Sequence, residues 1–370
     1  MLNNKNLWDV MQTDTLGAVI YQRALVHPQK IAFSFLGQEA IDQELTYGEL
    51  FQSASQLALS LRAEYQKGDR MVLLYPSGTD FIIAFVACLY ADLIAVPVNV
   101  PRKSRHLSRL LWVVEDAGAK AVLTDQKTKM LFSENLKEPE FLALSLLPWL
   151  ETAEMASISL SDDPAKRDRP RKQLLTQIAF LQYTSGSTSL PKGVMVSQGN
   201  LVANLKMMVS AFGMNETSIG VSWLPLFHDM GLIGAVLQVL YTGAHLYLMS
   251  PQSFIQNPIR WLRAISTYRA DYTVGPNFAL EHCVNYISNS DLEQIDLSSL
   301  RCFILGSEFI RKSAIDAFAQ QISLCGFSSS VFCPAYGLAE ATLFVSGDRV
   351  PVSDDALSHE KTSVFLLSKQ

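Results

Sequence analysis

Short apolar stretches alternate with longer helix-like stretches along most of this chain, and this alternation limits the folds it can adopt. In the first half, DRMVLLYP, IAVPVNV and KAVLTD have the character of strands, and TDFIIAFVACLYAD and LSRLLWVVEDAGA lie between them with the character of helices. Strand after strand is apolar on both faces, which is typical of parallel sheets covered by helices on both sides. The sequence therefore predicts an α/β fold built on mostly parallel sheets flanked by helices.

The chain divides into two halves that share this rhythm. The segment LSDDPAKRDRPRKQ, residues 160–173, is charged, contains proline and lacks apolar periodicity. Such a segment is typical of a surface linker. We therefore expect a first α/β subdomain over residues 1–175 and a second over residues 176–346. Residues 347–370 are more polar and are predicted to be a tail that starts a truncated region.

Composition and charge argue against several classes of protein. The 370 residues are 49% hydrophobic and carry a net charge of −5. The overall electrostatic field of the chain would therefore not attract nucleic acid or anionic lipid. The longest apolar run, FIIAFVACLYADLIAVPVNV, contains Asp92 and ends with prolines, so it predicts a helix, a turn and a strand rather than a membrane span. The five cysteines form no CxxC pair, and the N-terminus lacks a secretion signal. We expect a cytoplasmic protein with reduced thiols, no nucleic-acid partner and no stable membrane insertion.

The stretch LQYTSGSTSLPKGVMVS, residues 181–197, places small hydroxyl side chains, glycine and one lysine between two predicted strands. Such a loop can turn several backbone N–H groups toward one anion, and a polyphosphate suits it best. The Walker pattern fails, because Gly186 is followed by Ser-Thr-Ser-Leu and then Pro191. Composition alone also allows a serine-rich surface turn.

The whole string YTSGSTSLPKGV resembles the phosphate-binding signature of the adenylate-forming (AMP-binding) superfamily, which includes acyl-CoA synthetases. WLPLFHDMGLIG (223–234) and PAYGLAEAT (334–342) resemble two further motifs of that superfamily, and the resemblance extends to about residue 346. Within it, RWLRAISTYRADYTVGPNF is most similar to the fatty acyl-AMP ligases. The resemblance implies the N-terminal domain of that superfamily, with two stacked, mostly parallel sheets and with the ATP and acyl site in the second subdomain, residues 176–346. It also implies a ligase that adenylates a fatty acid with ATP and Mg²⁺ and passes the acyl group to an acyl carrier protein.

The resemblance also implies roles for particular residues. The predicted catalytic residues are His228, Lys192 and Glu340, and the predicted magnesium ligands are Glu340 and Thr184. The residues expected to bind the nucleotide are Thr184, Ser185, Gly186, Ser187, Thr188, Gly306, Ser307, Glu308, Ala335, Tyr336 and Gly337. The residues expected to bind the acyl substrate are Trp223, His228, Asp229, Met230, Gly275 and Phe278.

Simpler interpretations of these residues remain open at this point. By itself, a glutamate such as Glu340 is more often a solvated helix residue, and Tyr336 and the methionines are also compatible with ordinary core packing. A fatty carboxylate is ionised at pH 7, so its attack on phosphorus needs no general base. The lack of a Ser-His-Asp or paired-carboxylate pattern therefore agrees with adenylate formation.

Two parts of the family pattern are not found in the sequence. The Thr-Gly-Asp segment that binds ribose and the small C-terminal domain with its lysine are both missing, and SGD at 346–348 lies too close to Glu340 to replace the former. We therefore expect an N-terminal domain that is poorly active alone and whose carrier-protein contact needs the missing C-terminal region. The alternatives are a fatty acyl-CoA synthetase and a non-catalytic, truncated nucleotide- or acyl-binding module.

Overall fold

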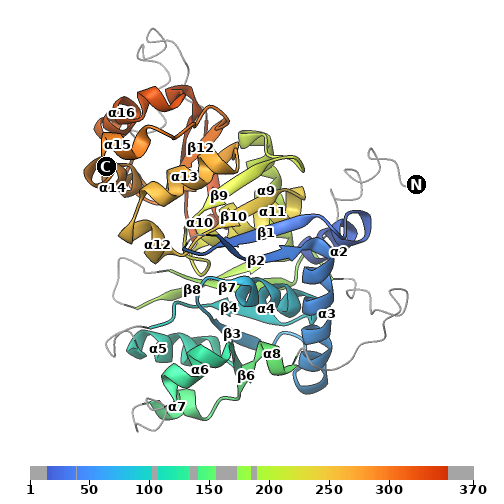
Figure 1. Ribbon diagram of the computed structural model, residues 1–370. Helices are drawn as coiled ribbons and strands as arrows, with labels where there is room; N and C mark the ends of the chain where they lie inside the picture. Colours follow the sequence, from blue (N-terminus) through green and yellow to red (C-terminus); the bar gives the residue numbers. More distant parts are fainter. Residues whose placement is uncertain are drawn as a thin grey trace, which may run out of the picture.

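The computed structural model describes residues 15–38, 40–101, 107–133, 141–155, 173–184 and 190–348. These residues form two mainly parallel β-sheets with helices packed against them (Figure 1), which confirms the predicted fold class. Nearly all of the predicted linker and most of the predicted tail lie outside the described residues. A search of the described residues finds no helix with the length and apolar character needed to span a membrane.

The larger sheet has eight strands, and its interior is parallel. Only the two edge strands, β2 and β14, run antiparallel to their neighbours. In spatial order the strands are β14 (Phe344–Gly347), β13 (Phe332–Gly337), β12 (Cys302–Leu305), β11 (Tyr272–Gly275), β9 (Ile219–Ser222), β10 (His245–Leu248), β1 (Ile31–Leu36) and β2 (Ile41–Thr46).

The smaller sheet has six strands with one antiparallel edge, where β8 pairs with β7. In spatial order they are β6 (Trp149–Glu151), β5 (Ala121–Thr124), β3 (Arg70–Leu74), β4 (Ile94–Pro97), β7 (Ile178–Thr184) and β8 (Lys192–Ser197). Each sheet contains strands from both sides of residue 175. The early strands β1 and β2 belong to the larger sheet, and the later strands β7 and β8 belong to the smaller one. The subdomain boundary at residue 175 stays a prediction, and the hydrogen-bonded sheets do not follow it.

Helices cover the sheets because the inner strands carry apolar side chains on both faces. In β3, Met71 and Leu73 face the larger hydrophobic core, and Val72 and Leu74 face a smaller core on the other side. Figure 1 shows α5, α6 and α7 together on the outer side of the smaller sheet and α13 to α16 beside the larger sheet. The helices are α2 (Leu16–Val26), α3 (Tyr47–Glu64), α4 (Thr79–Tyr90), α5 (Leu107–Ala117), α6 (Gln126–Phe132), α7 (Leu142–Ser145), α8 (Thr152–Met155), α9 (Gln198–Phe212), α10 (Asp229–Gly231), the π-helical η4 (Leu232–Leu237), α11 (Gln238–Thr242), α12 (Pro251–Gln256), α13 (Ile259–Thr267), α14 (Asn277–Tyr286), α15 (Asn289–Leu292) and α16 (Lys312–Gln321).

Several local predictions agree with the structure. Thr46 and Glu49 form the expected capping box at the start of α3, with each side chain bonded to the other's backbone N–H. The long apolar run folds as the buried helix α4, a turn and the strand β4. Asp92 lies in that turn with φ 60°, a left-handed conformation that aspartate tolerates better than most residues.

Candidate active site

One cavity of about 640 Å³ opens where the carboxyl ends of strands from both sheets meet. In open parallel sheets this edge is the usual place for ligands. Its lining comes from segments at the ends of β4, β7, β9, β11, β12 and β13 and from α5, α9 and η4. The predicted site residues that line it are Thr184, His228, Asp229, Met230, Gly306, Ser307, Ala335, Tyr336, Gly337 and Glu340.

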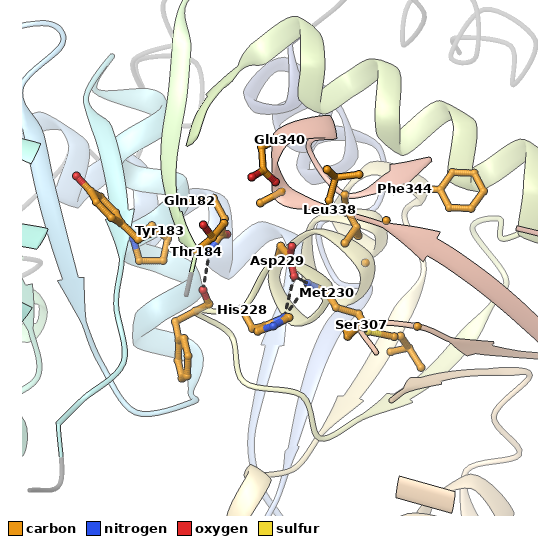
Figure 2. Close-up of a pocket in the computed structure, with 18 of the residues that line it drawn as sticks. Gln182, Tyr183, Thr184, His228, Asp229, Met230, Ser307, Leu338, Glu340 and Phe344 are labelled. Atoms are coloured by element: carbon orange, nitrogen blue, oxygen red, sulfur yellow. Dashed lines mark hydrogen bonds and ion pairs between the residues drawn. The ribbon is translucent and has the colours of Figure 1, made fainter. Parts of the chain in front are cut away.

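A tight turn after β9 presents His228 and Asp229 to the cavity (Figure 2). The turn requires Gly231, since a Cβ there would lie 2.2 Å from the carbonyl oxygen of Pro225. His228 Nδ1 lies 2.8 Å from Asp229 Oδ1, and this hydrogen bond raises the pKa of His228 above its ordinary value. Asp229 Oδ1 also accepts from the backbone N–H of Met230 at 2.7 Å. The turn therefore holds an imidazole that is biased toward its cationic form.

The end of β7 forms the opposite wall of the cavity through Gln182, Tyr183 and Thr184. The Tyr183 hydroxyl donates to Asp116 of α5 at 2.6 Å, which ties the strand to that helix. In the antiparallel pair, Thr184 lies opposite Lys192 at the start of β8. The predicted phosphate-binding residues Ser185, Gly186, Ser187 and Thr188 connect these two strands and lie outside the described residues.

Glu340 is held at the cavity by the short helical turn that follows β13. This turn packs tightly, because a Cβ on Gly337 would lie 2.1 Å from the carbonyl oxygen of Leu343. Asn204 of α9 fixes the same segment: its side chain donates to Phe344 O at 2.8 Å and accepts from Phe344 N at 3.0 Å. Glu340 itself is exposed and forms no hydrogen bond or ion pair with any described residue. The fold therefore presents a carboxylate that is available to a ligand.

Ser307 follows β12 and has a strained backbone. Its φ is 68°, which costs free energy for a residue with a side chain, and such strain often marks a functional position. Its hydroxyl donates to the sulfur of Met230 at 2.8 Å. This contact joins the β12 loop to the His228 turn at the floor of the cavity.

An apolar wall completes the cavity. Met208 and Phe212 come from α9, Gly234 comes from η4, and Leu343 and Phe344 follow the Glu340 turn. The rings of Phe212 and Phe344 meet edge to face with centroids 5.2 Å apart. A Cβ on Gly234 would lie 3.2 Å from Leu343 Cδ2, so glycine preserves space in this wall.

Five predicted site residues are not in the described lining of this cavity: Lys192, Trp223, Gly275, Phe278 and Glu308. Trp223 is buried and stacks on Phe254 with centroids 4.0 Å apart. Phe278 meets Trp223 edge to face at 5.8 Å, and its backbone N–H donates to Glu308 at 2.6 Å. These aromatic side chains pack with one another in the structure.

Three important residues were not singled out from the sequence. Gln182 and Asn204 are buried polar side chains inside apolar patterns, and that contrast with their neighbours could have identified them. Arg109 of α5 lines the cavity from the first half of the chain, is exposed and has no partner among the described residues. No local pattern indicates Arg109, because only the packing of α5 beside β7 brings it there.

The described part of the chain contains no cluster of three or more His, Cys, Asp or Glu side chains that could hold a metal ion. Glu340 and Thr184 offer oxygen atoms at the cavity, and oxygen is the donor that Mg²⁺ prefers. A Mg²⁺ ion takes one or two carboxylates and completes its shell with phosphate oxygens and water. These two residues therefore fit a cation that arrives together with a phosphate ligand.

The model of the AMP-binding enzyme family matches residues 20–363 of this chain. The chain therefore belongs to this family. The medium-chain-fatty-acid–[acyl-carrier-protein] ligase JamA of Moorena producens is 38% identical over 339 residues, which are 90% of this chain and 56% of that protein. The putative fatty-acid–CoA ligase fadD21 of Mycobacterium leprae is 34% identical over 352 residues, or 91% of this chain and 58% of that protein.

Solved structures agree with this assignment. A fatty acyl-adenylate ligase from L. pneumophila, in complex with acyl adenylate and pyrophosphate, matches with a TM-score of 0.83 and 39% identity. The match covers 94% of this chain and 58% of that one. The predicted resemblance to the adenylate-forming superfamily, and to its fatty acyl-AMP ligases, is confirmed. The chain spans 56–58% of the length of these three relatives.

Proposed function

We propose that this chain is the adenylate-forming part of a fatty acyl-AMP ligase. In this proposal it uses ATP to convert a fatty acid into acyl-AMP, and pyrophosphate leaves. The acyl group is then passed to an acyl carrier protein, in line with the relative that is described as an [acyl-carrier-protein] ligase.

One observation carries the proposal. The same cavity is lined by Glu340, whose carboxylate has no partner among the described residues, by the end of β7, and by an apolar wall that includes Met208 and Phe212. A ligand with both a charged phosphate part and a long apolar part would fit both features. The volume of about 640 Å³ lies in the usual range for small-molecule sites.

The chemistry requires alignment and charge neutralisation. A carboxylate oxygen of the fatty acid attacks the α-phosphorus of ATP, and the bond from that phosphorus to the oxygen that bridges to the β-phosphorus breaks. The apolar wall would hold the acyl chain, and the His228 turn would orient the carboxylate, with the raised pKa of His228 favouring a cation there. Arg109 would add positive charge at the same cavity.

Glu340 and Thr184 would hold Mg²⁺ in the loaded enzyme, where the ion neutralises phosphate charge. Ser185 to Thr188 and Lys192 would bind the β- and γ-phosphates, in line with their family motif. The nucleoside would lie against Gly306, Ser307 and the Ala335–Gly337 strand end, which line the cavity. Glu308 would act indirectly, through its contact with Phe278 N. Trp223, Gly275 and Phe278 remain proposed acyl contacts, and the rings of Trp223 and Phe278 pack against each other.

We also propose the cytoplasm as the place of action. No disulfide joins the five cysteines, all of which are buried in the described part of the chain. The contact with a carrier protein would involve residues beyond those described here. Nucleic acid is not a proposed partner, since the net charge is −5.

The proposal is tested by calorimetry of the 370-residue chain with a non-hydrolysable dodecanoyl-AMP analogue and with MgATP. The wild type should bind both. Glu340→Ala should weaken MgATP binding at least tenfold, because a charge-assisted contact to the cation is lost. Binding of the metal-free analogue should change much less.

Glu115→Ala is the matched control. Glu115 is an exposed glutamate of α5 that does not line the cavity, and its carboxylate has no partner among the described residues. Its replacement should leave both affinities unchanged. A wild-type chain that binds neither probe would refute the proposed function.

A second candidate is a fatty acyl-CoA synthetase, which the description of the Mycobacterium leprae relative favours. The two candidates share acyl-AMP formation and differ in the acceptor. Incubation with fatty acid, MgATP and coenzyme A, followed by mass spectrometry, separates them: acyl-CoA would support the synthetase, and acyl-AMP alone would support the ligase. A chain that binds the ligands without forming either product would instead be a binding module.

A further inference from the structure

Gln182 is a buried polar side chain in the wall of the cavity. It lies on β7, two residues before Thr184, and is 4% exposed. Its Nε2 donates to the carbonyl oxygen of Phe227 at 3.0 Å, in the turn that carries His228. Figure 2 shows this contact crossing from the β7 strand to the His228 turn. The amide thus connects the smaller sheet to a loop of the larger sheet.

The other end of the same amide is left without a partner. Oε1 of Gln182 is buried and accepts no hydrogen bond from any described residue. Reversing the amide would place this oxygen against the Phe227 carbonyl, and two acceptors repel each other. The contact with Phe227 therefore fixes which atom is the unused acceptor. A buried acceptor without a donor is unfavourable, so its presence in a ligand cavity calls for an explanation.

We propose that Gln182 is a positioning and ligand-binding residue of this site: its Nε2 holds the His228 turn, and its Oε1 accepts a hydrogen bond from the bound ligand. The identity of the ligand rests on the proposed function. A fatty carboxylate and a polyphosphate are both acceptors at pH 7 and have no proton to give. The donor must therefore be an O–H or N–H group of the nucleoside, or a water molecule that enters with the metal ion.

The chain contains a matched control for this role. Gln198, at the start of α9, is 1% exposed, and its Oε1 is also buried without a partner among the described residues. Gln198 does not line the cavity. Methionine is close to glutamine in size and has no strong hydrogen-bonding group, so Gln182→Met and Gln198→Met remove the same chemistry from two different places.

The experiment measures ligand affinity by calorimetry on the 370-residue wild type, Gln182→Met and Gln198→Met. The probes are MgATP and the metal-free dodecanoyl-AMP analogue. Gln182→Met should weaken the binding of at least one of the two probes about tenfold. Gln198→Met should leave the affinity for both probes unchanged. If Gln182→Met loses affinity for both probes, the donor to Oε1 belongs to the nucleoside. If it loses affinity for MgATP alone, the donor is a water molecule that enters with the metal ion. Equal affinities for wild type and Gln182→Met, or equal losses in the two variants, would overturn ligand binding by Oε1.

A second measurement needs no ligand and tests the positioning role. NMR titration of the His228 imidazole should give a raised pKa in the wild type and in Gln198→Met, and a value nearer to ordinary histidine in Gln182→Met, where the turn is released from β7. An unchanged His228 pKa in Gln182→Met would overturn the positioning role. If the wild type binds neither probe, the proposed function fails, and this titration still decides whether Gln182 positions the turn.

Discussion

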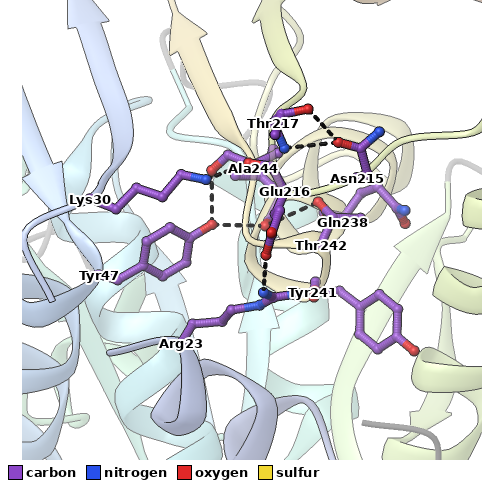
Figure 3. Close-up of polar contacts among 11 residues, drawn as sticks. Arg23, Lys30, Tyr47, Asn215, Glu216, Thr217, Gln238, Tyr241, Thr242 and Ala244 are labelled. Carbon is purple, nitrogen blue, oxygen red and sulfur yellow. Dashed lines mark hydrogen bonds and ion pairs between the residues drawn. The ribbon is translucent and has the colours of Figure 1, made fainter. Parts of the chain in front are cut away.

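The helical segment from Asp229 to Thr242 has a different polar environment at each of its two ends. At the cavity end, Glu340 has no partner among the described residues, and Oε1 of Gln182 is buried without a donor. At the far end, the Tyr47 hydroxyl lies 3.0 Å from the carbonyl oxygen of Val239 and 2.9 Å from that of Ala244, and donates to them. Figure 3 shows the polar side chains gathered at that far end.

Charged groups at the far end are also paired. Arg23, which is 2% exposed, lies 3.3 Å from Glu216 and donates to the carbonyl oxygen of Tyr241 at 3.3 Å. Lys30 donates to the backbone carbonyl of Glu216. The helix ends at Gly243 (φ 79°), where a Cβ would lie 2.7 Å from the Arg23 guanidinium. Burial lowers the pKa of both Arg23 and Lys30, and the nearby Glu216 opposes this shift.

The comparison separates two uses of polar residues. Partners within the protein pair the charged groups of the far end and close the helix, although the buried amide of Gln238 there has no partner among the described residues. At the cavity end, Glu340 and Oε1 of Gln182 have no partner in the described part of the chain, and a ligand can supply one. Substitutions at the far end should therefore change stability, and substitutions at the cavity end should change binding.

Arg23→Met should give the largest effect. It removes a buried guanidinium that pairs with the part-exposed carboxylate of Glu216 and donates to the Tyr241 carbonyl, so the free energy of unfolding should fall by about 2 kcal/mol. Urea unfolding measures this loss. Arg263→Met, on the exposed surface of α13, should change stability by less than about 0.5 kcal/mol. A similarly small loss in Arg23→Met would show that the far-end cluster does not stabilise the fold.

Arg109→Gln should affect binding and leave stability unchanged. The exposed guanidinium lines the cavity without a partner among the described residues, so its loss should weaken binding of MgATP or pyrophosphate about tenfold. Calorimetry measures the affinity, with Arg263→Gln as the control. If Arg109→Gln lowers stability and keeps the affinity, the distinction between the two ends is wrong at this position.

Tyr47→Phe should have a smaller effect than Arg23→Met, because the ring stays buried and only the hydroxyl is removed. The carbonyls of Val239 and Ala244 lose a donor, and stability should fall by about 1 kcal/mol. Thermal unfolding at one protein concentration measures the change. Ligand affinity should be unchanged, so a selective loss of binding would connect the two ends of the segment.

Asp229→Asn should produce the smallest effect on stability, because half of the His228 side chain is exposed. The hydrogen bond with Asp229 raises the pKa of His228, so the pair stabilises the folded chain most below about pH 6.5, the ordinary histidine value. This contribution is lost as pH rises through the raised value. The wild type should exceed Asp229→Asn in stability at pH 5.5 and lose that advantage by pH 8. An advantage that grows with pH would contradict this assignment.

Much of the site was predictable because its residues belong to contiguous motifs. His228, Asp229 and Met230 share one turn, and Ala335 to Glu340 share one strand end, so local sequence already placed them together. Trp223 and Phe278 also belong to quoted motifs, but a motif does not fix where an aromatic side chain points, and their contact with substrate stays a prediction. An aromatic side chain beside a motif can turn into the cavity or into the core, and these two pack against each other.

The sequence by itself determined the order of strands and helices, the capping box at Thr46 and the family motifs, because these depend on residues close together along the chain. Only the tertiary structure decided that β1 and β2 join the larger sheet while β7 and β8 join the smaller one. It also brought Arg109 and Gln182 to the same cavity and left an oxygen of Gln182 without a donor among the described residues. Contacts between distant segments depend on how the packed layers meet, and no local pattern encodes that.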